Sequence, residues 1–217
     1  MKAFVITLDS NIISEAGSME CIRSSHGVGN DFVVTPYHAI RSKDAMAALN
    51  QEGIKWTYPW SQPKLDFASG LKLSPYSTQD KGKRVGCFMS HYNLWKMAAD
   101  STDPILVLEH DALFTKRLEY DTILDNNYGV IGINDPRGAT RKSTVYHTMI
   151  GESRWPVQPV PRIDDVMIPQ GLAGNSAYII KPWAAKHVIN KVKEIGAWPN
   201  DALLCYQIFG IAFLGVT

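Results

Sequence analysis

The chain has 217 residues, of which 45% are hydrophobic and 20% are charged, and its formal net charge is +1. This balance is that of a folded globular protein, which excludes intrinsic disorder as a description of the whole chain. A net charge so close to zero gives no overall electrostatic reason to expect binding to nucleic acid or to an anionic membrane. The length suits a single domain covering residues 1–217.

The number of cysteines and the lengths of the hydrophobic segments indicate the cellular compartment. The three cysteines, at positions 21, 87 and 205, follow no zinc-binding spacing, and their odd number argues against a disulfide framework. No segment approaches the ~20 apolar residues that a membrane-spanning helix needs. The first nine residues hold only a short apolar run without a signal-peptide cleavage site. We therefore expect a cytoplasmic protein without a membrane span.

The first eighty residues begin with alternating strands and helices. An apolar run predicts a buried strand at 3–8, and apolar side chains at helical spacing predict a helix at 12–25, with Ile12 and Met19 on its core face. A second strand is expected at 32–35, ending before Pro36, and a second helix at 42–50. Periodicity is then lost over residues 54–80, where aromatic residues and prolines predict a long ordered loop.

The remaining pattern continues the alternation. A helix is predicted at 82–100, with Cys87 and Trp95 in the core, and an apolar central strand at 105–108. After a strand at 128–133, a second long loop or lid is expected at 135–170. The chain then continues with a strand at 176–180, helices at 182–195 and 201–209, and an apolar segment at 211–216. The order predicts an α/β fold, a Rossmann-like domain with a mostly parallel central sheet flanked by helices.

Polar residues follow three of the predicted strands, at 7–11, 109–111 and 134–135. In open α/β sheets, ligands bind beyond the carboxyl ends of the strands. Glu109 and Asp111 follow an apolar strand two residues apart and can converge on one hard cation such as Mg²⁺ or Mn²⁺. Such an ion holds phosphates and stabilises a departing diphosphate. The alternative is that both carboxylates are solvated residues that merely end a strand.

The segment from Gly86 to Phe114 resembles glycosyltransferase family 25, which contains lipopolysaccharide-type and collagen galactosyltransferases. The shared elements stand in the family's order. They are Gly86-Cys87, Ser90-His91, Trp95, the apolar strand and the triplet Glu109-His110-Asp111, whose middle residue is usually aspartate in the family. Residues 4–10, 174–188 and 200–204 fit the family more loosely, so the resemblance extends over most of the chain in order.

This resemblance implies a GT-A type fold and a metal-dependent hexosyl- or pentosyltransferase. The donor would be a nucleoside diphosphate sugar, and the acceptor a hydroxyl group. Mn²⁺ or Mg²⁺ would be held by Glu109, His110 and Asp111. The catalytic residues would be Asp201, as the base, and Asp111. The donor would contact Thr7, Leu8, Asp9, Arg84, His91 and Glu109. The transferred sugar or acceptor would contact Asn134, Asp135, Asn175 and Ser176.

Two features leave the acceptor open. The loops at 54–80 and 135–170 are expected on the acceptor side of the site. They carry or adjoin two basic clusters, which could contact donor phosphates or an anionic acceptor: Lys81, Lys83 and Arg84, and Arg137, Arg141 and Lys142. The acceptor could therefore be a glycan, a glycolipid or a modified base in DNA. A further alternative is a non-catalytic domain that binds a sugar nucleotide or a protein.

Overall fold

The computed structural model describes residues 1–139 and 142–217. In chain order, its strands are β1 (Lys2–Thr7), β2 (Val34–His38), β3 (Lys64–Asp66), β4 (Leu71–Leu73), β5 (Ile105–Glu109), β6 (Val130–Gly132), β7 (Gln158–Pro159), β8 (Ala177–Ile180) and β9 (Leu214–Val216). Seven of them form one sheet in the order β2-β1-β5-β8-β6-β9-β7, and β3 pairs with β4 in a separate hairpin.

Five strands of the large sheet run in one direction, and β7 and β8 run in the other. The predicted α/β fold with a mostly parallel central sheet is therefore confirmed. The carboxyl ends of β1, β2, β5, β6 and β9 share one edge of the sheet, and β8 begins at that edge. This arrangement brings the polar strand ends of the sequence to one side of the molecule.

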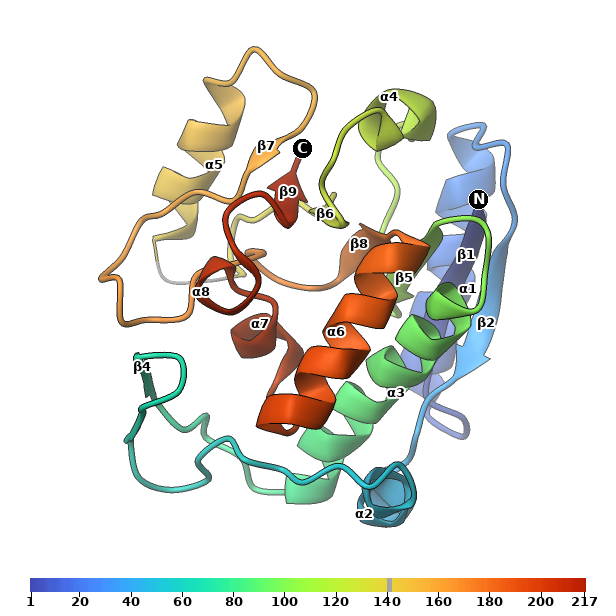
Figure 1. Ribbon diagram of the computed structural model, residues 1–217. Helices are drawn as coiled ribbons and strands as arrows, with labels where there is room; N and C mark the ends of the chain where they lie inside the picture. Colours follow the sequence, from blue (N-terminus) through green and yellow to red (C-terminus); the bar gives the residue numbers. More distant parts are fainter. Residues whose placement is uncertain (140–141) are drawn as a thin grey trace.

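Helices cover both faces of the sheet (Figure 1). They are α1 (Ile12–Gly27), α2 (Ser42–Gln51), α3 (Lys81–Ala99), α4 (Tyr120–Leu124), α5 (Ser143–Gly151), α6 (Pro182–Ile195), α7 (Asn200–Leu203) and α8 (Tyr206–Phe209). Helices α3 and α6 lie side by side on one face, and α2 packs against α3. Helix α1 covers the other face, where Cys21 belongs to the same buried hydrophobic cluster as Leu106 and Leu108 of β5. None of the helices in the described ranges is long and apolar enough to cross a bilayer.

Helix α3 supplies much of the core. Phe88, Met89, Leu94 and Trp95 are at most 1% exposed, as their spacing predicts. The prediction that Cys87 lies in the core is wrong, because its side chain is exposed on the face of the helix that borders a cavity.

Helix α1 buries a different face from the one predicted. Ile12 is 84% exposed and Met19 is 63% exposed, whereas the buried positions are Ser14, Ser18, Cys21 and Ser25. These small side chains let the helix lie close to the sheet, and their hydroxyls find partners there. Ser18 bonds the hydroxyl of Thr7 at 2.7 Å, and Ser14 accepts from the backbone N–H of Leu8 at 2.8 Å. Satisfied serines therefore replace the apolar stripe that amphipathic periodicity predicts.

Strand β2 continues through Pro36, so the expected end of the strand before that residue is wrong. Pro36 lies opposite Val5 in the register with β1. Because β2 is the edge strand of the sheet, the missing N–H of a proline can face away from the ladder.

The two long loops are more structured than predicted. Residues 54–80 contain the β3–β4 hairpin, and residues 135–170 contain α5 and β7. The helix expected at 201–209 is instead two short helices, α7 and α8. They are separated because Cys205 is extended and forms a bridge with Gly171, so the chain cannot continue as a helix there.

Candidate active site

Two cavities lie next to each other at the carboxyl edge of the sheet. The larger has a volume of about 680 Å³ and the smaller about 430 Å³. Gly174 and Asp201 line both cavities, so the two spaces meet at these residues. The arrangement provides two neighbouring compartments with one carboxylate between them.

The larger cavity is lined by residues at the ends of helices and strands. Lys83, Arg84 and Cys87 come from the first two turns of α3, and Glu109 ends β5. Asn175 precedes β8 and reaches the same cavity. Helix α3 begins in this position because Asp80 caps it, with its carboxylate accepting from the backbone N–H of Gly82 at 2.9 Å.

Asp201 is held at the junction of the cavities by hydrogen bonds with two neighbours. It lies in the first turn of α7, shortly after Trp198-Pro199, as predicted from the sequence. The side-chain amide of Asn175 is oriented so that its oxygen and its nitrogen both have hydrogen-bond partners. In this orientation the oxygen accepts from the backbone N–H of Asp201 at 2.9 Å. The phenol of Tyr76 donates to Oδ2 of Asp201 at 3.0 Å.

Tyr76 is itself fixed by its surroundings. Its ring stacks on Tyr58, with centroids 5.7 Å apart, and the Arg84 guanidinium lies 4.6 Å from its centroid. Burial, together with the nearby charge of Asp201, raises the pKa of Tyr76 well above its ordinary value. The phenol therefore keeps its proton at neutral pH and remains a donor to Asp201.

A buried histidine connects α3 to the end of β5. His91 is 1% exposed, and its Nε2 lies 3.1 Å from Oε1 of Glu109. Its Nδ1 lies 2.8 Å from the hydroxyl of Tyr178, which also accepts from Nε1 of Trp95 at 2.8 Å. Burial works against the charged form of both His91 and Glu109. For His91, the interactions with Tyr178, Cys87 and then Glu109 outweigh burial and raise its pKa, and for Glu109 the hydrogen bond and charge of His91 outweigh burial and lower its pKa.

The side chains of the predicted metal-binding triplet do not converge as one group of ligands among the described residues. Glu109 turns toward α3 and His91, whereas the backbone of His110 lies against Gly17 of α1. A Cβ at Gly17 would stand 2.5 Å from the carbonyl oxygen of His110, so only glycine permits this approach. Asp111 is exposed, and its charge adds to the larger effect of burial in raising the pKa of Cys21 on α1.

One group of potential metal ligands converges among the described residues. It consists of Cys87, His91 and Glu109, whose ligand atoms all lie within 4.8 Å of one another. Of the predicted triplet, only Glu109 belongs to this group. Metal binding by the triplet remains a prediction.

The residues expected to contact the nucleotide lie at the end of β1. The hydroxyl of Thr7 is buried against Ser18, and Leu8 donates its N–H to Ser14. Asp9 accepts from Nδ1 of His38 at 2.7 Å, which joins the ends of β1 and β2. Neither of the two cavities is lined by Thr7, Leu8 or Asp9.

The other predicted substrate contacts surround Gly174. Asn134 donates to the carbonyl oxygen of Ala173 at 2.8 Å, and Asp135 pairs with Arg137. The carbonyl oxygen of Ser176 accepts from the N–H of Glu109 at 2.8 Å, which fixes the start of β8 beside the end of β5. Of the four residues, Asn175 lines the larger cavity.

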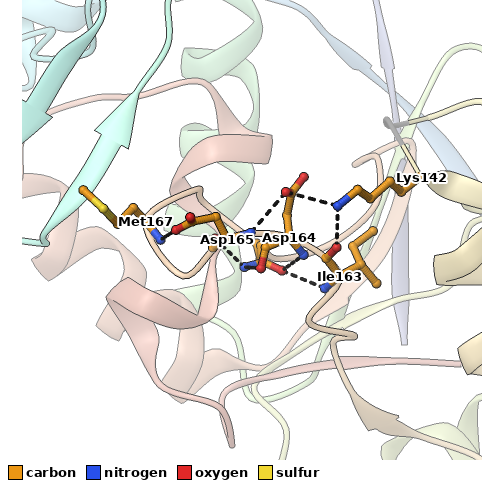
Figure 2. Close-up of polar contacts among 6 residues, drawn as sticks. Lys142, Ile163, Asp164, Asp165 and Met167 are labelled. Atoms are coloured by element: carbon orange, nitrogen blue, oxygen red, sulfur yellow. Dashed lines mark hydrogen bonds and ion pairs between the residues drawn. The ribbon is translucent and has the colours of Figure 1, made fainter.

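Both long loops line the smaller cavity. Residues 58–76 contribute one wall, and residues 161–174 contribute another. Figure 2 shows part of the second wall, where Nζ of Lys142 donates to the carbonyl oxygen of Ile163 at 2.9 Å and to Asp164 at 3.2 Å. The side-chain oxygen of Gln170 accepts from the N–H groups of Ile163 and Asp164, at 2.8 Å each. These bonds give the loop a defined shape without regular secondary structure.

The basic residues do not form one uniform surface. Lys83 and Arg84 line the larger cavity, and Lys81 lies over the ring of Trp60 at 5.3 Å. In the second cluster, Arg137 pairs with Asp135 and Lys142 with Asp164, so neighbouring carboxylates balance these charges. Arg141 lies outside the described residues.

Three residues of this region were not identified as functional from the sequence. Tyr76 and Tyr178 carry no local motif, and their roles follow from contacts more than 80 residues away in the chain. Cys87 does carry a signal, because its spacing of four residues from His91 places both on one face of a helix.

Residues 47–131 match the model of glycosyltransferase family 25, described as LPS biosynthesis protein. The matched segment contains α3 and β5, and with them His91 and Glu109. The match confirms the resemblance of the segment from Gly86 to Phe114, and it supports sugar transfer as the reaction.

Among the solved structures that align with the chain is one that covers most of it. The crystal structure of mouse xyloside xylosyltransferase 1 in its apo form aligns with a TM-score of 0.46 at 9% sequence identity. The alignment covers 96% of this chain and 81% of that one. No match is found among curated proteins.

Proposed function

We propose that the protein transfers a sugar from a nucleoside diphosphate sugar to an acceptor hydroxyl. The donor would occupy the larger cavity, and the acceptor would enter through the smaller one. The observation that carries this proposal is the family match over residues 47–131, which supplies both the α3 and β5 walls of the larger cavity. The junction of two compartments at one carboxylate suits a reaction between two substrates.

The larger cavity offers groups that complement such a donor. Lys83 and Arg84 place positive charge where a diphosphate would need it. The side chain of Asn200 also borders this cavity, and its Oδ1 is buried with no hydrogen-bond partner among the described residues. A buried acceptor without a partner is costly, so a sugar hydroxyl donating to Asn200 would satisfy it.

Asp201 is the best placed of the cavity's carboxylates to act as the general base. Among the described residues, Asp80 and Glu109 also line the larger cavity, but Asp80 caps α3 and Glu109 is bound to His91. Asp201 borders both compartments, as a base between donor and acceptor must.

The proposed reaction moves one proton, forms one bond and breaks one bond. Asp201 takes the proton of the acceptor hydroxyl, and the acceptor oxygen forms a bond to the anomeric carbon. The bond from that carbon to the diphosphate oxygen breaks, and its electron pair leaves with the diphosphate. Lys83 and Arg84 stabilise the charge that develops there. Tyr76 holds the carboxylate of Asp201 in position by its hydrogen bond.

A divalent ion at the triplet 109–111 would assist departure of the diphosphate, as the family resemblance implies. The three side chains of the triplet do not form one group of converging ligands among the described residues, and Glu109 is bound to His91 instead. No step of the proposed mechanism is therefore assigned to an ion held by the triplet.

The proposal is tested by replacing the base. We expect Asp201→Asn to reduce transfer of labelled sugar by roughly 10²–10⁴-fold, the usual contribution of general base catalysis. Donor binding should persist in the variant, measured as the rise in unfolding temperature with the nucleoside diphosphate sugar that stabilises the wild type. Asp103→Asn removes an exposed carboxylate outside both cavities and serves as the matched control.

Two results would contradict the proposal in different ways. Normal transfer by Asp201→Asn would show that another group is the base. Failure of a full panel of nucleoside diphosphate sugars to stabilise the wild-type protein, together with absence of transfer to glycan, glycolipid or DNA acceptors, would exclude a sugar transferase.

A further inference from the structure

Two residues that line the larger cavity and a third that is buried behind them are arranged as metal ligands. The thiol of Cys87, the imidazole of His91 and the carboxylate of Glu109 have their ligand atoms within 4.8 Å of one another. In a tetrahedral zinc site, bond lengths of about 2.0–2.3 Å place neighbouring ligand atoms roughly 3.3–3.7 Å apart. The 3.1 Å separation of His91 Nε2 and Glu109 Oε1 is already close to this range.

The local structure explains how the group comes together. Cys87 and His91 are four residues apart on α3, so they lie one helical turn apart on the same face. Glu109 is the last residue of β5, and β5 alternates so that Ile105, Val107 and Glu109 face α3. Two ligands on one helix and a third on a buried strand form a rigid framework that needs only side-chain adjustment to close on an ion.

The histidine is oriented in the way that metal-bound histidines usually are. Ligating imidazoles commonly direct their second nitrogen to a fixed hydrogen-bond partner, which sets the ring orientation. Here Nδ1 of His91 meets the Tyr178 hydroxyl at 2.8 Å, and the Tyr178 ring stacks on the imidazole with centroids 5.7 Å apart. The Trp95 indole in turn donates to the same hydroxyl at 2.8 Å. This network leaves Nε2 directed at Glu109 and available for a metal.

We propose that Cys87, His91 and Glu109 bind one zinc-type ion, with its fourth coordination position open to the larger cavity. Cys87 and Glu109 both line that cavity, whereas His91 is buried behind them. Three protein ligands and one open position are typical of catalytic zinc sites, whereas structural zinc sites have four protein ligands. An open position at this place can take water or an oxygen of a bound phosphate.

The ligand types select the metal. Mg²⁺ and Mn²⁺ favour carboxylate, carbonyl and water oxygens, whereas thiolate and imidazole favour Zn²⁺ and chemically similar ions such as Co²⁺. The proposal therefore differs in both metal and ligands from the Mn²⁺ or Mg²⁺ expected at 109–111. It stands on the geometry of these three residues and is independent of sugar transfer.

Cobalt reports directly on the sulfur ligand. The full-length protein, freed of metal with a chelator and kept reduced, would be titrated with Co²⁺ while its absorption is recorded. We expect saturation at one ion per chain, with a near-ultraviolet thiolate-to-cobalt band and the intense visible bands of a four-coordinate ion. Zn²⁺ should displace Co²⁺ and abolish these bands, and Mg²⁺ in large excess should not.

Variants assign the ligands. Cys87 is exposed, so Cys87→Ser should fold normally and lose the thiolate band. Tyr178→Phe should weaken binding about 10–100-fold, as expected when the partner of a ligating histidine is removed. Cys21→Ala, which removes a different thiol, should leave the spectrum unchanged. Circular dichroism of each metal-free variant separates loss of a ligand from loss of the fold.

Three outcomes would overturn the site. Absence of stoichiometric Co²⁺ or Zn²⁺ binding by the wild type would do so, and so would a thiolate band that survives in Cys87→Ser. Binding that is lost in Asp111→Asn but retained in Cys87→Ser would place the metal at the triplet instead. These readouts need neither donor nor acceptor, so their failure is distinguishable from failure of the proposed sugar transfer.

Discussion

The phenol of Tyr76 donates a hydrogen bond to the carboxylate of Asp201, and the two oxygens lie 3.0 Å apart. The pair joins the loop at 54–80 to the first turn of α7, and the two residues are 125 positions apart in the sequence. It also stands where the two cavities meet, so it links the acceptor-side loop to the proposed base. We infer that Tyr76 is a positioning residue for Asp201.

Removing only the hydroxyl of Tyr76 tests this relationship. Tyr76→Phe keeps the ring that stacks on Tyr58 and contacts Arg84, but it deletes the donor to Asp201. We expect kcat to fall about tenfold, from the loss of one hydrogen bond to a charged group, with the KM for the donor unchanged. A rise in donor KM with normal kcat would instead make Tyr76 a donor-binding residue.

The smaller cavity should determine acceptor use. Ser74 is exposed and lines this cavity, so Ser74→Trp should obstruct it and raise the KM for the acceptor, while hydrolysis of the donor continues at its original rate. Ser61→Trp adds the same side chain at an exposed position of the same loop outside both cavities. Equal losses of transfer and donor hydrolysis in Ser74→Trp would mean that the loop supports the fold and does not select the acceptor.

Gly86 should be required for the contact between α3 and the segment before α2. A Cβ at this position would stand 2.5 Å from the carbonyl oxygen of Ile40, a backbone atom that cannot move freely. We expect Gly86→Ala to lower the free energy of unfolding by about 1–3 kcal/mol in urea denaturation. At Gly27, the last residue of α1, a Cβ would meet no atom within 4 Å, so Gly27→Ala should be neutral or stabilise by up to about 1 kcal/mol. Similar effects of the two variants would contradict the close approach at Gly86.

The cap of α3 should make stability depend on pH in the acid range. The hydrogen bond from Ser42, followed by those from backbone N–H groups, lowers the pKa of Asp80 in the folded state. Because the folded pKa lies below the unfolded value of about 3.9, the ionised cap stabilises the fold fully above that value. This contribution is lost as the pH falls through the folded pKa.

Asp80→Asn isolates the titration, because asparagine also caps helices but carries no charge. The urea midpoint of the wild type should exceed that of the variant at neutral pH, and the difference should shrink as the pH approaches about 3. A difference between the two proteins that stays constant over this range would exclude the Asp80 carboxylate as its source.

Hydrophobic patterns in the sequence correctly predicted those helices and strands that are buried along most of their length. The apolar run at 105–108 and the helical spacing from Val85 to Ala98 predicted β5 and α3, because both elements are buried and their sequences show it. The same segment carried the family resemblance. The prediction failed for α1, since a helix that bonds to a sheet through serines has no apolar stripe for periodicity to detect.

Hydrophobic patterning and local motifs were enough to predict the α/β fold class, the order of its major elements and the family resemblance of the segment containing His91 and Glu109. Which side chains meet became known from the packing of the elements against one another. Sequence adjacency suggested that Glu109 and Asp111 act together, but Asp111 is not part of the group of potential ligands that contains Glu109. Glu109 instead meets Cys87 and His91, and Asp201 meets Tyr76. Local periodicity reports burial along one element, whereas a site depends on distances between elements that are set by packing.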